Sequence, residues 1–132
     1  MRYRITFTNI ETDKQLEVAI TVRPNNTTDN VMESIREAPS CVYKAILGTE
    51  ASGQNNKISS GYASVAKARG VSKARVNIDS DFQALVTANP ALVPILSIYM
   101  INQDTATSAQ MRVRVDFLYY AEFSDRKLQL QS

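Results

Sequence analysis

Apolar and polar residues alternate with a period of two in the first part of the chain. From Arg2 to Thr8 the odd positions are apolar and the even positions are polar, and the segment from Gln15 to Val22 repeats this pattern. Successive side chains of a β-strand point to opposite faces, so each segment is predicted to form a strand with one buried face. The polar residues from Asn9 to Lys14 predict a hairpin loop that joins the two as sequential antiparallel strands.

The longest alternating segment lies near the end of the sequence. From Met111 to Phe123, thirteen residues keep one phase, with apolar side chains at the odd positions. At about 3.3 Å per residue this strand would span roughly 40 Å. The segment before it, from Leu92 to Ile101, is almost continuously apolar. It predicts a strand that is covered on both faces, with Pro94 near its start.

Two more strands are predicted in the middle of the chain, from Cys41 to Leu47 and from Lys57 to Val65. They flank a loop from Gly48 to Asn56, whose Gly, Ser, Asn and Gln content predicts exposure to solvent. The overlapping segment from Tyr62 to Arg69 also fits a helix, because its apolar residues are spaced three and four apart and Gly70 can serve as the C-cap. The sequence leaves both interpretations open.

Short helices are predicted in two of the connections. The first runs from Asn30 to Glu37 and has a capping-type Glu33 three residues after Asn30. The second runs from Ser80 to Val86, with Ser80 as its N-cap. About seven strands, few helices and long polar loops predict an all-β fold, an antiparallel β-sandwich or barrel with short helices in the connections.

Length and hydropathy narrow the class of protein further. The 132 residues contain no low-complexity tract or internal repeat, so residues 1–132 are expected to form a single soluble domain. The first residues do not have the charged leader and apolar segment of a signal peptide. The longest apolar run, from Ala91 to Ile101, is far shorter than the roughly 20 residues that cross a bilayer. We therefore expect no membrane partner.

The composition excludes several kinds of catalysis. The chain contains no histidine and one cysteine, Cys41, which removes the commonest general acid–base group, every histidine-activated nucleophile and any cysteine-based metal cluster. No carboxylate pair or glycine-rich phosphate loop is arranged for a reaction. We expect a protein that is not an enzyme and has no catalytic residues, metal or cofactor. Cys41 is expected to be a buried small apolar residue.

Five stretches of the chain combine into a more specific pattern. They are Pro39 to Thr49, Lys57 to Tyr62, Lys67 to Val71, the pair Asn89-Pro90 ahead of the apolar strand, and Arg112 to Lys127. The closing pattern is an apolar strand, a polar turn and a long alternating strand with Tyr and Phe that ends in basic residues. It resembles the final strand pair of the single jelly-roll capsid proteins of small icosahedral viruses. The nearest similarity is to the capsids of circular single-stranded DNA viruses and of related small RNA viruses.

This resemblance implies a viral jelly roll, an eight-stranded antiparallel sandwich. The expected function is that of a coat protein whose copies assemble into an icosahedral shell around a viral nucleic-acid genome. The protein would be found in the virion after assembly in the cytoplasm or nucleus of a host cell. The sequence departs from the family in two respects, since no Arg/Lys-rich arm precedes the first strand and about seven strands are predicted. Three explanations for the eighth strand stay open: it is absent, it is not recognised in the pattern, or a segment outside these residues supplies it.

The net charge of the chain limits how much nucleic acid it can neutralise. The 15 Lys and Arg and the 13 Asp and Glu give a net charge of +2. A shell of about sixty copies would carry about +120, whereas a genome of one or two thousand nucleotides carries on the order of a thousand phosphate charges or more. The charge of these residues therefore neutralises little of a genome. A shell built from them requires an additional basic segment or extensive neutralisation by counterions, or its interior is empty.

Two kinds of basic grouping are candidates for non-specific phosphate contacts. In the strands, alternate spacing places each of two arginine pairs on one sheet face, where the pair can contact phosphates. The alternative interpretation is that each pair belongs to the ordinary polar face of an amphipathic strand. Around Gly70, four cations lie within nine residues, but no aromatic residue interleaves them to stack bases, which favours an ordinary solvated turn. The candidate nucleic-acid-binding residues are Arg2, Arg4, Lys67, Arg69, Lys73, Arg75, Arg112 and Arg114.

Contacts between copies are predicted at one aromatic residue and in the loops. Tyr120, on the polar phase of the last strand, is the candidate interface residue, whereas Tyr119 and Phe123 on the apolar phase are expected in the core. The loops expected to form subunit contacts or the outer surface are Asn25 to Asn30, Gly48 to Lys57 and Asn102 to Ser108.

Asp79 and Asp81, with Glu122 and Asp125 elsewhere, are the only carboxylate groupings that suggest calcium. Their Asp-Ser-Asp spacing is much weaker than a calcium loop. Capping of a short helix by Asp79 or Ser80 is therefore the favoured interpretation.

A second function of a different class competes with the shell. A small β-barrel module could bind nucleic acid as a monomer or small oligomer. Such a module needs exposed aromatic residues beside its basic residues. The aromatic residues here lie mostly on the apolar phase of the strands, which favours the shell.

Overall fold

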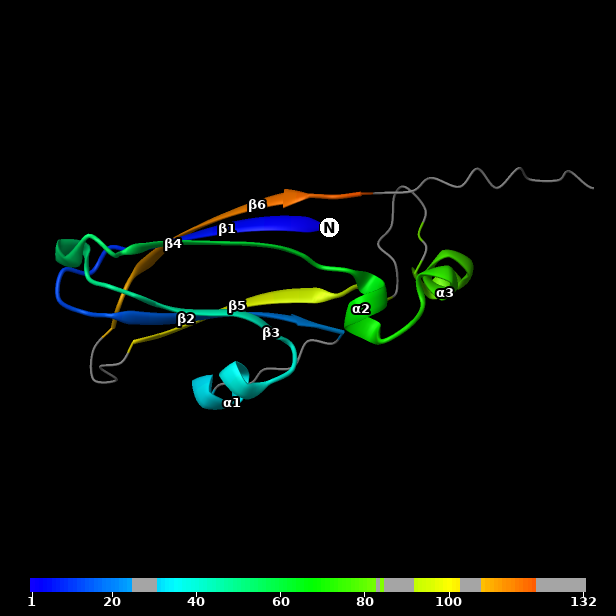
Figure 1. The fold of residues 1–132 in the computed structure, drawn as a ribbon, viewed down its shortest axis with the longest axis horizontal. Helices are drawn as coiled ribbons and strands as arrows, with labels where there is room; N and C mark the ends of the chain where they lie inside the picture. The colour runs from blue at the N-terminus through cyan, green and yellow to red at the C-terminus, as the bar shows by residue number, and fades with distance from the viewer. Residues whose placement is uncertain (25–30, 83, 85–91, 103–107, 121–132) are drawn as a thin grey trace, which may run out of the picture.

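The computed structural model describes residues 1–24, 31–82, 84, 92–102 and 108–120. These residues form a two-layer sandwich in which each layer is an antiparallel sheet of three strands (Figure 1). Short helices lie in the connections between strands. The all-β sandwich predicted from the sequence is confirmed.

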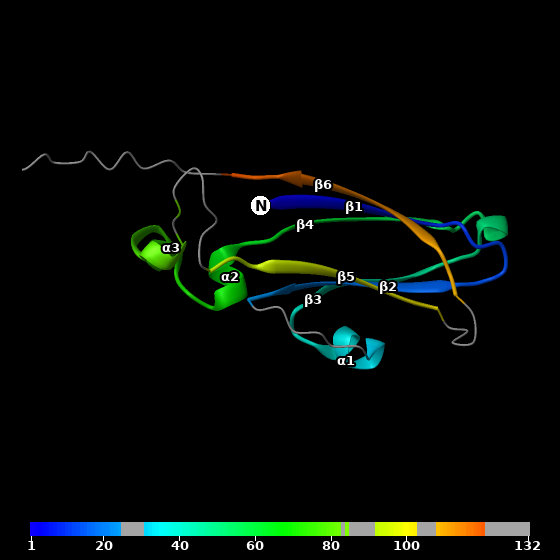
Figure 2. The same ribbon diagram turned by 180° about the vertical axis from the view of Figure 1, so that it is seen from behind.

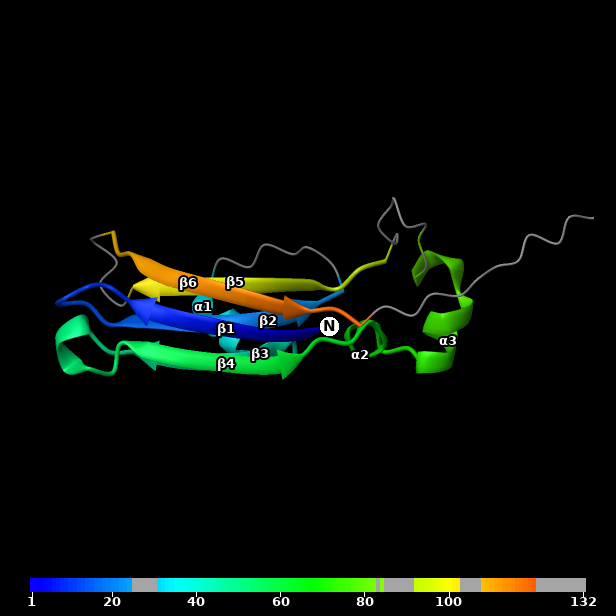
Figure 3. The ribbon, with the colours of Figure 1, turned by 90° about the horizontal axis from the view of Figure 1, so that it is seen from above.

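Each layer combines two strands from the first half of the chain with one strand from the second half. Sheet A has the order β4-β1-β6, with the bounds β4 (Asn56–Tyr62), β1 (Arg2–Asn9) and β6 (Met111–Leu118). Sheet B has the order β3-β2-β5, with the bounds β3 (Cys41–Leu47), β2 (Leu16–Arg23) and β5 (Ile95–Asn102). Seen from above, β1 lies over β2, and β6 lies over β5 (Figure 3).

The strand pairing is nested. The consecutive strands β2 and β3 pair within sheet B, and the strands that flank them in the sequence, β1 and β4, pair within sheet A. The last two strands repeat this arrangement, since β5 pairs with β2 and β6 pairs with β1. The predicted hairpin between the first two strands is therefore wrong, because β1 and β2 lie in opposite sheets. Each has one apolar face, and stacking the two faces buries more apolar surface than pairing edge to edge.

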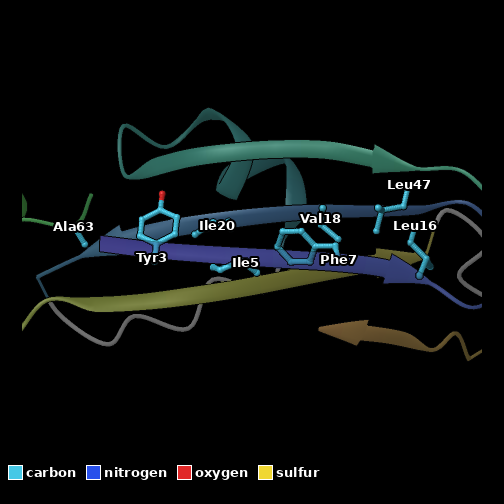
Figure 4. Packing of buried hydrophobic residues seen from close by; sticks show 8 residues of the cluster. All are labelled: Tyr3, Ile5, Phe7, Leu16, Val18, Ile20, Leu47 and Ala63. Carbon is cyan, nitrogen blue, oxygen red and sulfur yellow. The ribbon is translucent and has the colours of Figure 1, made fainter. Parts of the chain in front are cut away.

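The core lies between the central strands of the two sheets (Figure 4). The inward-facing residues Tyr3, Ile5 and Phe7 of β1 pack against alternate residues of β2, of which Val18 and Ile20 are fully buried. The ring of Phe7 also stacks on Tyr43 of β3, with ring centroids 6.2 Å apart. The period-two pattern of the sequence thus describes the true inward faces of both central strands.

The outer faces of the two sheets differ. Helix α1 (Met32–Glu37) lies against the outer face of sheet B, as Figures 1 and 2 show. Its buried residues Met32 and Ile35 pack on Ala19, and Arg36 forms an ion pair of 2.9 Å with Glu17. Strand β2 is therefore covered on both faces. No element in the described part of the chain covers the outer face of sheet A in these views.

The loop after β1 is held by a buried amide. The side chain of Asn9 is fully buried, and its Nδ2 donates hydrogen bonds to the carbonyl oxygens of Lys14, at 2.7 Å, and Gly48, at 2.9 Å. Its Oδ1 accepts a bond of 2.9 Å from the backbone N–H of Glu11. These bonds tie the end of β1 to the loop that enters β2 and to the end of β3.

The helix predicted from Asn30 to Glu37 is confirmed with shorter bounds. Helix α1 begins after Val31, which forms no side-chain cap, and the predicted cap Asn30 lies outside the described residues. Both interpretations of residues 57–69 are correct in part, because β4 ends at Tyr62 and helix α2 (Val65–Arg69) follows, ending at Gly70 with φ 65°. The predicted helix from Ser80 is in its described part the 3₁₀ turn η2 (Ser80–Phe82), and Ser80 is the first residue of this turn rather than the predicted N-cap. Residues 83, 85 and 86 lie outside the described part.

Two elements escaped prediction. Helix α3 (Lys73–Ile78) begins at Ser72, whose hydroxyl accepts a bond of 3.2 Å from the backbone N–H of Arg75. The loop before β4 contains the 3₁₀ turn η1 (Glu50–Ser52).

The last strand is shorter than its alternating pattern. Strand β6 ends at Leu118, and residues 121–123 of the predicted strand lie outside the described part. The expectation that Tyr119 packs in the core is wrong, because its side chain is 69% exposed. The corresponding expectation for Phe123 concerns a residue outside the described part. The predicted phase is correct within β6, since Val113, Val115 and Phe117 pair with the inward-facing residues of β1.

Candidate nucleic-acid interface

The register of sheet A brings four arginines to its outer face. Arg2 and Arg4 of β1 are exposed and alternate with the buried core residues of that strand. In the pairing of β1 with β6, Arg114 lies opposite Thr6 and Arg112 lies opposite Thr8. Thr6 and Thr8 are on the same face of β1 as Arg2 and Arg4. The two arginine pairs that the sequence placed on separate strands therefore share one sheet face. Because strands rise about 3.3 Å per residue, they form a stripe roughly 20 Å long.

This face carries the positive charge of the molecule. The four arginines are accompanied by one acidic residue at the outward strand positions, Asp116, which gives the face a net charge of +3. The whole chain has a net charge of +2, so its other residues together carry −1. Asp116 accepts a hydrogen bond of 3.2 Å from Nε of Arg114 and lies opposite Arg4. A concentrated positive face on a nearly neutral molecule attracts polyanions.

Exposed aromatic residues lie at one end of the stripe. Tyr62, at the end of β4, pairs with Arg2 in the register of β1 and β4 and is 63% exposed. Its ring lies 6.4 Å from that of Tyr120, which follows β6 and is equally exposed. Ile58 and Leu118 are exposed on the same face. The predicted interface residue Tyr120 is thus part of a surface that combines guanidinium groups with aromatic rings.

A shallow depression crosses the outer face at the level of the first arginines. It is lined by residues from all three strands of sheet A, among them Arg2, Arg4, Ser60, Asp116 and Leu118. An extended polyanion could lie in it with phosphates near the guanidinium groups and bases near the aromatic rings.

The second basic grouping is divided between α2 and α3, which lie beyond one end of the sandwich (Figures 1 and 2). Arg69 is half-buried and donates a hydrogen bond of 2.8 Å from its guanidinium to the carbonyl oxygen of Pro24. Arg75 lies 3.9 Å from the carboxylate of Asp79. Lys67 and Lys73 are exposed. Half of this grouping is therefore engaged within the protein, which supports the interpretation as a solvated turn.

The carboxylates considered for calcium act locally. Oδ1 of Asp79 accepts a hydrogen bond of 3.1 Å from the backbone N–H of Asp81, which caps the turn η2 as predicted. Among the residues that the structure describes, no group of three or more Cys, Asp or Glu side chains is placed to hold a metal ion. Glu122 and Asp125 lie outside the described part.

Cys41 is only partly buried, rather than fully buried as expected, and its thiol lies 3.4 Å from the carbonyl oxygen of Tyr43.

No helix in the described part of the chain is long and apolar enough to span a membrane.

Sequence reasoning identified Tyr120 as an interface residue but missed Tyr62 beside it. Tyr62 lies where the strand and helix interpretations overlap, and its outward direction follows from the pairing of β4 with β1. The alternation of Ile58, Ser60 and Tyr62 with the covered residues of β4 is the signal that could have found it.

Comparisons with known proteins give no match. No family model, no curated protein and no solved structure is similar to this chain.

Proposed function

We propose that this protein is a structural subunit whose copies assemble into a closed shell around nucleic acid, with the outer face of sheet A toward the nucleic acid. The observation that carries this proposal is the convergence of Arg2, Arg4, Arg112 and Arg114 on one sheet face, which no element of the described residues covers. The opposite sheet is covered on its outer side by α1, so the two faces of the sandwich offer different environments. A shell subunit needs such a difference between its two sides.

The binding mechanism is electrostatic and independent of sequence. Guanidinium groups contact phosphate oxygens, and release of counterions from the nucleic acid favours the complex. Tyr62 and Tyr120 add stacking with bases, and this stacking is independent of sequence because every base has an aromatic face. With four arginines on the face, the logarithm of the binding constant for a single strand should fall with the logarithm of the salt concentration with a slope of roughly −3.

The nested strand pairing supports a jelly-roll subunit. Jelly rolls combine two Greek keys into two facing sheets, and the described strands are distributed over two facing sheets with nested pairing within each sheet. Together with the resemblance of the closing strands to small icosahedral capsids, this topology favours a coat protein of a virion. The function requires no reaction at the site.

A second candidate function is favoured by one observation. Tyr62 and Tyr120 are exposed beside Arg2, which is the combination that a nucleic-acid-binding module acting as a monomer or small oligomer needs. The two functions share the binding face and differ in whether the nucleic acid is enclosed.

Nuclease protection separates them. The purified protein is mixed with single-stranded DNA or RNA at low salt, treated with nuclease and then extracted. A shell protects strands of defined length until the protein is unfolded with denaturant. A module that binds on an open surface leaves the nucleic acid digestible down to the footprint of single copies, and that result would contradict the shell.

A further inference from the structure

The two lateral edges of the sandwich differ in their chemistry. At the edge formed by β4 and β3, the inward-facing positions of β4 are Lys57, Ser59 and Gly61. Polar, charged and small residues of this kind are characteristic of strands that end a sheet, because they discourage pairing with another strand. Ser59 is buried and Lys57 is half-buried, so this edge is closed over the core.

The opposite edge is apolar and open. The inward-facing residues of β6 are Val113, Val115 and Phe117, which are 38, 37 and 45% exposed. Their partners on β1 include Ile5 and Phe7, which are fully buried. The same sheet face is therefore completely covered at its centre and nearly half exposed one strand further out.

The edge of the second sheet lies directly beneath. Strand β5 ends sheet B on the same side of the molecule as β6 ends sheet A (Figure 3). Its inward-facing residues Leu96 and Ile98 are only partly buried against the core. In the described part of the chain, β6 pairs only with β1 and β5 pairs only with β2. Two stacked strand edges with an apolar interior are thus available to pairing partners.

We propose that a second copy of this chain occupies this edge, related to the first by a two-fold axis perpendicular to the sheets. Such an axis pairs β6 of one copy antiparallel with β6 of the other and brings the two β5 edges together at the same time. Each sheet then continues across the axis from one copy into the next. A self-complementary contact of this type is the commonest symmetry of protein dimers.

The charges of β6 select a register for this pairing. With Val115 on the axis, Arg114 lies opposite Asp116 of the second copy, and the symmetry repeats this ion pair. The inward-facing side then places Val113 opposite Phe117 of the second copy, so apolar residues meet apolar residues. With Arg114 on the axis, two guanidinium groups would lie opposite each other, which is destabilising. The strand therefore carries both the apolar surface and the charge complementarity that a second copy requires.

This interface deepens the proposed function and rests on its premise that copies of the chain associate. It names the contact through which two copies would meet within a shell. It also predicts a dimer that forms without nucleic acid.

Disulfide trapping tests the interface. In a Cys41→Ser background, Val115→Cys is expected to form a disulfide-linked dimer under mild oxidation, because the two copies of this residue meet at the axis. Ile58→Cys, a more exposed position on the closed edge strand β4 (51% against 37% for Val115), is the control and is expected to stay monomeric. Absence of the Val115 cross-link, or equal cross-linking of both variants, would overturn the interface.

Sedimentation of charge variants tests it without a new cysteine. Arg114→Asp places like charges opposite each other and should weaken dimerisation about tenfold. Adding Asp116→Arg exchanges the two charges and should restore dimerisation, whereas no rescue would overturn the register. Shells without the Val115 cross-link would overturn this interface and leave the proposed function intact. Trapped edge dimers that never enclose nucleic acid would support the interface and contradict the shell.

Discussion

Arg4 of β1 lies directly opposite Asp116 of β6 in the antiparallel register of sheet A. Asp116 also accepts a hydrogen bond from Arg114 of its own strand, so this carboxylate contacts one guanidinium group and lies at a position opposite another arginine. It is half-exposed and lies on the face that carries the positive charge. Its charge pairs with Arg114 and lowers the attraction of the face for phosphates.

Removal of this carboxylate should strengthen binding of nucleic acid. Asp116→Asn raises the net charge of the face by one, and we expect affinity for single-stranded DNA at low salt to rise several-fold. Fluorescence anisotropy with a labelled oligonucleotide measures this change. Asp81→Asn changes the net charge of the molecule equally at an exposed position of η2 and should have a much smaller effect.

The arginines of β6 should contribute more to binding than the lysines of α2 and α3. Arg112→Gln with Arg114→Gln is expected to lower the amount of co-purified nucleic acid and to reduce the salt slope by about 1.4. The control Lys67→Gln with Lys73→Gln removes the same charge from exposed positions beyond the end of the sandwich. Equal losses in the two variants would contradict the assignment of the binding face.

The aromatic end of the stripe should bind bases. Tyr62→Leu or Tyr120→Leu is expected to weaken binding of a single strand by between about fivefold and a hundredfold, because stacking on one ring contributes about 1–3 kcal/mol. Tyr119→Leu is the matched control, since Tyr119 contacts Phe117 of the inward phase and is equally exposed. If binding depended on Tyr119 as strongly as on Tyr62, the bound nucleic acid would not lie on the outer face of sheet A.

Asn9 should be essential for stability. Asn9→Ala removes three side-chain hydrogen bonds from a fully buried position, leaves their partners unsatisfied, and should lower the free energy of unfolding by about 2–4 kcal/mol. Urea denaturation followed by circular dichroism measures this loss. Asn56→Ala, at an exposed position of β4, should change stability by less than about 0.5 kcal/mol. Equal stability of the two variants would refute the role of the Asn9 bonds.

Stability should decline in alkaline solution. Burial raises the pKa of the Tyr43 phenol above its ordinary value of 10.0. Above about pH 10 the unfolded chain has lost this proton while the folded protein retains it, so the free energy of unfolding falls as the pH rises further. Tyr43→Phe keeps the ring that stacks on Phe7 but cannot ionise, and its stability should fall less steeply over this range. Parallel pH profiles of the two proteins would contradict this effect.

The sequence predicts the strands well because their signal is local. The alternation of β1 and β2 describes their inward faces, and Gly70 ends α2 in the left-handed conformation that glycine adopts most easily. The phase of β6 is also correct. Each of these features depends on neighbours within a few residues, which a single sequence records.

The pairing of strands depends on residues that are distant in the sequence. Arg4 and Asp116 become neighbours only through the register of β1 and β6, so the common face of the four arginines could not be read from their spacing. The same applies to the separation of β1 from β2, which a short polar loop does not reveal. Helix α3 was missed because its capping residue Ser72 follows a basic segment without a clear apolar period.

Negative-stain electron microscopy of the purified protein, with and without single-stranded nucleic acid, tests the proposed shell most directly. We expect closed particles of uniform diameter that contain nucleic acid and that fail to retain it when Arg2, Arg4, Arg112 and Arg114 are all replaced by glutamine. A protein that remains a monomer or small oligomer at high concentration in the presence of nucleic acid would contradict the shell.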